Sequence, residues 1–230
     1  MKLGEKRNLK IPTTTVAMKL QASGAAMSAA ATVLTLTIAA APALGQAHNP
    51  PSTISYLEGT SVMSMKDDLA NRSLDIHWPA GFTPDDADLF SHNELLINAP
   101  CERVWRHIVE ATKWPRWYPN SSSVEILGDG GSVLKDNTVF RWTTFGLPLE
   151  SRVNEFVPFS RIGWFGYAPG TAPTFYHTWY LSPEGDGCRA VTDEVGKGES
   201  AAHFREVDEG AMHRGHDLWL ATLKWVSESK

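Results

Sequence analysis

Residues 123–195 form a succession of short strand-like segments that are separated only by turns. The segments lie at about 123–127, 137–145, 149–157, 160–167, 174–181 and 188–195. The breaks between them are rich in glycine and proline, as in Pro169-Gly170 and Pro183–Gly187. Parallel strands need crossover connections of about a dozen residues or more, and no break is that long. The sequence therefore predicts an antiparallel sheet.

Helical periodicity flanks the sheet region. Before it, HNELLIN at 92–98 predicts a first strand, and 101–112 has an apolar helical face that ends at Trp114-Pro115. After it, apolar positions recur at steps of 4, 3, 4 and 3, at Met212, His216, Trp219, Leu223 and Val226. This last helix is the only segment long enough to cover a curved sheet, so we expect an α+β fold.

The first 47 residues have the composition of a secretory signal peptide. A basic start precedes a run without charge whose Ala-rich middle ends in APALGQA at 41–47. Small residues there suit cleavage after Gly45 or Ala47. An uncleaved membrane anchor is the alternative, but modest hydrophobicity and Pro42 favour cleavage. We expect an exported, most simply periplasmic, protein whose mature chain is not inserted in a membrane.

Residues 48–89 have the character of a weakly structured lead-in. HNPPST is turn-like, WPAGFTPDD at 78–86 has no period, and 54–65 has the pattern of one short strand pair. The folded domain is therefore expected to span residues 90–230.

The charge balance argues against polyanionic partners. The whole chain has a formal charge of −5, and residues 1–47 hold five basic side chains and one acidic one, a net of +4. The rest of the chain therefore carries −9. Phosphate backbones and anionic lipid surfaces would be repelled, so we expect no nucleic-acid partner.

Strand alternation identifies candidate pocket residues. In FYHTWYL, the more apolar face holds Phe175, His177, Trp179 and Leu181, and we expect it to face the helix. Phe140, Trp142 and Thr144 form a similar inward row. His177 is then a polar group among aromatic ones. It is either a core histidine with a hydrogen-bonded neighbour or a group that contacts a ligand or transfers protons.

His216 occupies the buried stripe of the last helix, where an apolar residue would be the default. With His213 one turn earlier and Asp217 beside it, the pattern resembles half of a metal site. Zinc sites need three or four protein ligands, and no third one is evident, so we expect neither metal nor cofactor. In a regular strand one of Asp193 and Glu194 faces the cavity, where it could orient a histidine or accept a substrate hydroxyl. The plainer alternative is a solvated strand face.

The segment INAPCERVWRHIVEATKWPRWYPN at 97–120 resembles the opening of the START-like SRPBCC superfamily, often labelled polyketide cyclase/dehydrase-like. Its members share an Ile-x-Ala-Pro, a Val-Trp shortly after, and a Trp-Pro-x-Trp. The likeness continues in order to the end of the chain, with FRWTTFG at 140–146, SRVNEFVP at 151–158, RIGWFG at 161–166, FYHTWYLSP at 175–183, VTDEVGKG at 191–198 and HDLWLATLKW at 216–225.

The resemblance implies a helix-grip fold: a curved seven-stranded antiparallel sheet around the long C-terminal helix, with two short helices after the first strand and a cavity inside. Trp117 and Tyr118 fall where short helices would close its mouth. The expected lining combines these two residues with strand and helix positions, namely Phe140, Trp142, Trp164, His177, Trp179, His216 and Leu220. The first and last strands are neighbours in this fold, so in an oxidising compartment the resemblance also implies a Cys101–Cys188 disulfide.

These features predict an exported binding or carrier protein for a hydrophobic or aromatic small molecule. The alternative is a cyclase- or dehydratase-like enzyme that uses His177 or His216 as general acid/base, with Asp193 or Glu194 assisting. A partner-binding protein with a collapsed cavity is a third possibility. Export favours the carrier, because polyketide synthesis is normally cytoplasmic.

Overall fold

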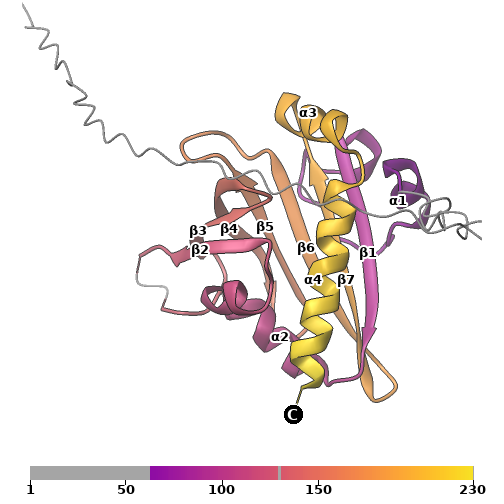
Figure 1. The fold of residues 1–230 in the computed structure, drawn as a ribbon, viewed down its shortest axis with the longest axis vertical. Helices are drawn as coiled ribbons and strands as arrows, with labels where there is room; N and C mark the ends of the chain where they lie inside the picture. Colours follow the sequence, from indigo (N-terminus) through magenta and orange to yellow (C-terminus); the bar gives the residue numbers. More distant parts are fainter. Residues whose placement is uncertain (1–62, 129–130, 230) are drawn as a thin grey trace, which may run out of the picture. The chain divides into compact units, whose positions relative to one another are not determined.

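Seven antiparallel strands form one sheet in the order β1-β7-β6-β5-β4-β3-β2 in the computed structural model (Figure 1). The strands are β1 (Leu89–Ile97), β2 (Ser121–Ile126), β3 (Val139–Thr144), β4 (Leu147–Val157), β5 (Arg161–Tyr167), β6 (Phe175–Glu184) and β7 (Gly187–Gly196). Residues 63–128 and 131–229 are described; the predicted signal peptide, residues 1–47, lies outside them. The predicted antiparallel sheet is confirmed.

Helices occupy the two ends of the described chain and the connection after β1. They are α1 (Met65–Asn71), η1 (Pro84–Asp86), α2 (Cys101–Val109), η2 (Ala111–Arg116), α3 (Glu199–Val207) and α4 (Ala211–Glu228). The long α4 lies along the inner face of the sheet (Figure 1). The helix-grip fold is therefore confirmed, with α2 and η2 as the two short helices after the first strand.

Two irregularities let the sheet curve around α4. Strand β2 shifts register against β3 between Ser122 and Glu125, and β4 shifts against β5 between Val153 and Glu155. Such bulges bend a strand and increase its local twist. Ser123 has a φ of 53° at the first of them, a conformation that a non-glycine residue rarely adopts.

Aromatic rings fill one end of the space between the sheet and α4. Trp114, on η2, is fully buried, and its ring centroid lies 5.2 Å from those of Trp142 and Trp219. Phe140 and Trp164 complete its surroundings at 5.9 and 5.8 Å. Packing of this kind stabilises the domain through both buried area and ring geometry.

The lead-in differs from the weakly structured segment that the sequence predicts. Residues 63–88 contain α1 and η1, and Trp78 and Phe82 pack against Tyr176 on the outer face of β6. Tyr176 in turn lies over Gly163, where a Cβ would clash with its ring. Apolar residues spaced without a period can still cover a sheet face, which periodicity alone does not detect. Residues 54–62 of the predicted strand pair lie outside the described residues, and the remaining residues, 63–65, lead into α1, which begins at Met65.

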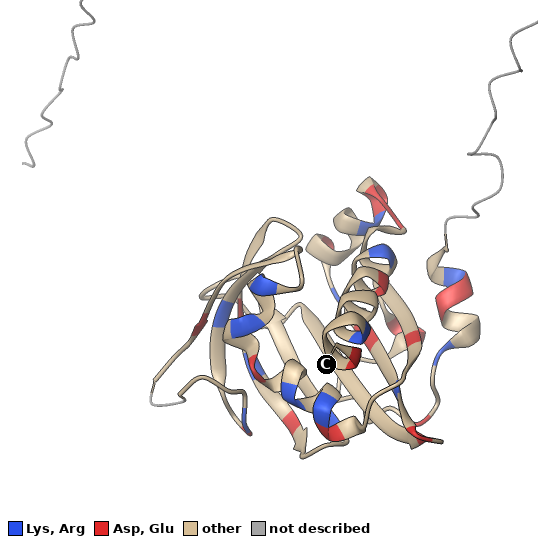
Figure 2. Cartoon of the chain, turned by 60° about the horizontal axis from the view of Figure 1, so that its bottom comes forward, with Lys and Arg blue, Asp and Glu red and all other residues tan. Residues whose placement is uncertain are grey.

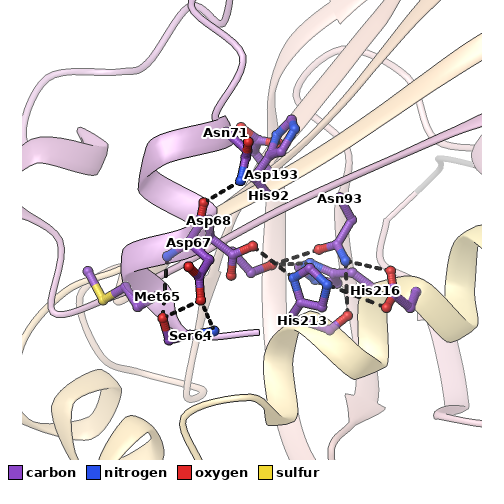
Figure 3. Close-up of polar contacts among 12 residues, drawn as sticks. Ser64, Met65, Asp67, Asp68, Asn71, His92, Asn93, Asp193, His213 and His216 are labelled. Atoms are coloured by element: carbon purple, nitrogen blue, oxygen red, sulfur yellow. Dashed lines mark hydrogen bonds and ion pairs between the residues drawn. The ribbon is translucent and has the colours of Figure 1, made fainter. Parts of the chain in front are cut away.

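A polar contact ties α1 to α4. Asp68 is buried, with 2% of the residue exposed, and its carboxylate lies 2.8 Å from Nδ1 of His213. Figure 3 shows these two side chains pointing toward one another. A capping box of Ser64 and Asp67 starts the helix that carries Asp68. The hydrogen bond to Asp68 raises the pKa of His213 above its usual value.

The stability that this contact contributes should depend on pH. A histidine whose pKa is raised on folding contributes stability that is fully present below its unfolded pKa of about 6.5 and is lost as the pH rises through the folded value. We expect Asp68→Asn to lower the free energy of unfolding by about 1.5–3 kcal/mol at about pH 5, and by less at about pH 8. Urea unfolding at the two pH values measures this. Asp85→Asn, which breaks an exposed pair with Arg72, is the matched control and should show no such trend; an equal loss for Asp68→Asn at both pH values would contradict the prediction.

No helix in residues 63–128 and 131–229 is both long and apolar enough to span a bilayer. Lysine and arginine are interspersed with aspartate and glutamate over the helices and strands (Figure 2).

Candidate functional site

A pocket lies between the inner face of the sheet and the N-terminal half of α4. Its lining is mostly aromatic and aliphatic, with a polar end, and comprises Trp142, Thr144, Phe145, Leu147, Leu149, Ser151, Trp164, Gly166, Phe175, His177, Glu194, Phe204, Met212, His216 and Trp219. The free space inside the pocket is about 30 Å³, which is room for about two water molecules. The pocket in this conformation is therefore narrow.

Two phenylalanines line the pocket from segments that the sequence analysis does not predict to cover it. Phe145 lies in the turn between β3 and β4, and Phe204 lies on α3, with their ring centroids 5.5 Å apart. The Phe145 ring packs so closely on Gly215 of α4 that any Cβ there would clash with it. A ligand larger than a few atoms would require one of these two rings to move.

The polar end is a row of residues across three strands. Glu194 on β7 is opposite His177 on β6 and opposite Ser91 on β1. From α4, His216 reaches down to this row, with its Nε2 3.0 Å from Glu194 Oε2 and its Nδ1 2.7 Å from Ser91 Oγ. The exposed fraction of the His216 side chain is 1%, and that of Glu194 is 14%.

Asn93 extends the polar end beyond Ser91. The amide nitrogen of Asn93 donates to the His213 carbonyl at 3.1 Å and to the Asp217 carboxylate at 2.8 Å, so Asn93 Oδ1 is an acceptor. The Ser91 hydroxyl lies 3.1 Å from this oxygen and 2.7 Å from Nδ1 of His216. Its one hydrogen can therefore be donated to either of these two acceptors.

The Glu194 carboxylate faces the other nitrogen of His216. Its Oε2 lies 3.0 Å from Nε2, and a hydrogen on Nε2 satisfies this contact, because a carboxylate only accepts. A metal ion bound by both side chains could take the place of that hydrogen.

His177 is the second histidine of the polar end. It is 3% exposed, its ring stacks 5.2 Å from that of Trp219, and its Nε2 lies 2.9 Å from Thr192 Oγ1. Burial, together with nearby His216, holds the pKa of His177 well below its usual value, so the ring is neutral at neutral pH. Its Nδ1 is buried and has no hydrogen-bond partner among the described residues, and the same is true of Nε1 of Trp219. Both atoms are available to a ligand.

The structure brings together a potential metal-ligand set that differs from the one considered on the sequence. One ligand atom each from His177, Glu194 and His216 lies within 4.8 Å of the others. His213 instead points away to Asp68. Strand pairing and helix packing thus place a third potential ligand next to His216, which the sequence pattern alone does not indicate.

Asp193 and Glu194 divide between the two faces of β7. Glu194 lines the pocket, whereas the fully buried Asp193 lies on the other face, 2.7 Å from Nδ1 of His92. Burial raises the pKa of Asp193, and the bond from His92 opposes that effect. The cavity-facing member of the pair is therefore Glu194.

Four of the residues expected to line the pocket do so: Trp142, Trp164, His177 and His216. The other five do not line it: Tyr118, Phe140, Trp179 and Leu220 are buried in the hydrophobic core, and the partly buried Trp117 packs against that core. The expected lid is one of these differences, because Tyr118 is fully buried and stacks on Trp219 at 4.5 Å. Phe140 differs because Trp114 fills the space in front of it.

Phe145 and Phe204 were not identified from the sequence, and neither was α3. The only local signal was an aromatic residue beside Gly146 in a tight turn, where Phe145 has a φ of 50°. Such a strained position is frequently functional. Helix α3 buries only Ala201, so it has little apolar periodicity to detect.

Cys101 and Cys188 form a disulfide, with their Cα atoms 5.0 Å apart. Cys188 is opposite Ile97 in the pairing of β7 with β1, and Cys101 begins α2 just beyond the end of β1. The bond therefore joins the start of α2 to the start of β7, at the end of the β1–β7 strand pair.

Fold and pocket together define a helix-grip protein with an apolar ligand site between its sheet and its C-terminal helix. Residues 92–225, more than half of the chain, match the family described as polyketide cyclase / dehydrase and lipid transport. The chain belongs to this family.

Solved structures with the same fold span a range of similarity. The hypothetical protein jhp0584 from Helicobacter pylori is 28% identical, with a TM-score of 0.63, over 68% of this chain and 98% of that one. The di-domain ARO/CYC proteins StfQ, of the steffimycin pathway, and BexL, of the BE-7585A pathway, are 16% and 21% identical. Their TM-scores are 0.49 and 0.48, over 61% and 64% of this chain and 52% of each of theirs. A search of curated proteins found no match.

Proposed function

We propose that this is an exported binding protein for a small aromatic or apolar molecule that carries one hydrogen-bonding group. The observation that carries the proposal is the polarity of the pocket: its walls are aromatic and aliphatic, and His177, Glu194 and His216 converge at one end. Few, well-placed polar groups in an apolar pocket are typical of sites that orient a small ligand.

The narrow interior favours a small ligand over a long lipid chain. With about 30 Å³ of free space, either ligand requires the rings of Phe145 and Phe204 to move apart, and a single aromatic ring requires a smaller movement than a lipid tail. Export is supported by the signal-peptide composition of residues 1–47 and by the disulfide, a bond that persists in oxidising compartments.

The pair p-cresol and toluene tests the proposal, because the two molecules differ only by one hydroxyl. We expect p-cresol to bind about 2- to 12-fold more tightly, since a hydrogen bond contributes about 0.5–1.5 kcal/mol. NMR titration of the indole N–H signals of Trp142, Trp164 and Trp219 measures both affinities. His177→Phe, which keeps a ring but removes its nitrogens, should abolish the preference.

The matched control is His203→Gln, an exposed histidine on α3 whose side chain is 74% exposed. It should leave the preference for p-cresol unchanged. Absence of binding by both molecules, or equal affinity for the two in the native protein, would refute the proposal. Mass spectrometry of the natively purified protein identifies any molecule that it retains.

A cyclase- or dehydratase-like enzyme is the second candidate, favoured by the contact between His216 and Glu194. In an aryl β-hydroxy ketone, a base would remove a proton from the α-carbon. The β-hydroxyl would then take up a proton and leave as water, which gives a conjugated ketone. Incubation with such a compound and detection of the loss of water by mass spectrometry distinguish this candidate. Only an enzyme would lose that turnover in Glu194→Gln.

A further inference from the structure

We propose that His177, Glu194 and His216 bind a divalent transition-metal ion, of which Zn²⁺ is the simplest example, at the polar end of the pocket. Two imidazole nitrogens and one carboxylate oxygen are a ligand set that such ions accept, and three protein ligands leave a coordination position open. That position would face the aromatic pocket. The proposal does not rest on the binding function above, because an ion could bind whether or not p-cresol does.

The first argument is geometric. Ligand atoms around a tetrahedral ion with bonds of about 2.0–2.2 Å lie about 3.3–3.6 Å apart. The three ligand atoms here lie within 4.8 Å of one another, and one pair, His216 Nε2 and Glu194 Oε2, is already at 3.0 Å. Rotation of the Glu194 side chain, the most exposed of the three, can supply much of the remaining adjustment.

The second argument comes from the hydroxyl groups behind the histidines. Ser91 Oγ lies 2.7 Å from Nδ1 of His216, and Thr192 Oγ1 lies 2.9 Å from Nε2 of His177. A histidine that binds a metal through one ring nitrogen almost always donates its other N–H to such a partner. Both rings have one nitrogen held in this manner and the other free of a backbone or hydroxyl partner.

The third argument weighs a proton against an ion. A hydrogen on Nε2 of His216 satisfies the contact with Glu194, but it leaves Nδ1 of His177 buried without a partner among the described residues. Buried polar atoms of this kind are rare in folded proteins. If Thr192 accepts from Nε2, the Nδ1 lone pair is free, and an ion bound there would satisfy all three side chains at once.

Calorimetric titration of the tag-free protein with Zn²⁺, after treatment with a chelator, tests the proposal. We expect one equivalent to bind, and bound Co²⁺ to give visible absorption bands. Glu194→Gln, which is nearly isosteric, and His216→Ala should each abolish stoichiometric binding. Ser91→Ala, which removes the hydroxyl beside Nδ1 of His216 but no metal ligand, should weaken binding about 10- to 100-fold.

His203→Gln is the control for adventitious binding by surface histidines and should keep the native affinity. Circular dichroism of each variant shows whether it is folded. If His216→Ala does not fold, Glu194→Gln still tests the proposal. The proposal is overturned if the native protein binds no Zn²⁺, if stoichiometric binding survives Glu194→Gln, or if binding is lost in His203→Gln. A lost preference for p-cresol with intact Zn²⁺ binding would instead refute the proposed function alone.

Discussion

Replacing both Cys101 and Cys188 by alanine is expected to lower the free energy of unfolding by about 4–5 kcal/mol. The disulfide joins residues that are 87 positions apart. In the chain-entropy model, a cross-link across a loop of this length lowers the conformational entropy of the unfolded chain, and this raises the free energy of unfolding by about 4–5 kcal/mol. Domains of this size are stabilised by only about 5–15 kcal/mol in total, so the loss is large.

Urea unfolding of the native protein and the double variant measures the difference. The native protein in the presence of dithiothreitol is the matched comparison, because it lacks the bond but keeps both side chains. The variant should also show a larger dependence of the free energy on urea, since its unfolded state is less constrained. Equal midpoints for the native protein and the double variant would show that the bond does not form or does not stabilise.

Trp219→Ala is expected to cost about 3–5 kcal/mol of stability. The Trp219 side chain is 2% exposed and stacks on Tyr118 at 4.5 Å on one part of its surface and on His177 at 5.2 Å on another. It therefore joins the aromatic core to the polar end of the pocket. Its removal leaves a cavity lined by rings that cannot collapse into it, because the sheet holds most of them.

Trp225→Ala is the control for Trp219→Ala, because it makes the same change on the same helix. Trp225 is 67% exposed, and exposed substitutions usually change stability by no more than about 0.5 kcal/mol. Thermal and urea unfolding of the two variants should therefore separate widely. Similar losses in both would mean that α4 does not pack on the sheet through Trp219.

Local pattern was enough to predict most of the elements. Short breaks between the strand-like segments required antiparallel neighbours, and the spacing of Met212, His216, Trp219, Leu223 and Val226 predicted α4. Both signals depend only on residues close in sequence. Alternation along β6 likewise placed His177 on the inner face, where the structure has it.

One feature of the polar end could have been found in the sequence. Strands β6 and β7 are joined by a two-residue turn at Gly185-Asp186, and such a turn fixes the register of a hairpin. Counting back from it places His177 opposite Glu194, which also settles which of Asp193 and Glu194 faces the pocket.

The sequence by itself determined the antiparallel sheet, the covering helix and the inward direction of His177, because those follow from periodicity and turn length. Only the tertiary structure decided which aromatic residues fill the core and which line the pocket. Trp114 and Tyr118 occupy space that could otherwise belong to a ligand, and that depends on how η2 packs against α4. The approach of His216 to Glu194 was decided in the same way, because the two residues are 22 positions apart and helix α3 lies between them.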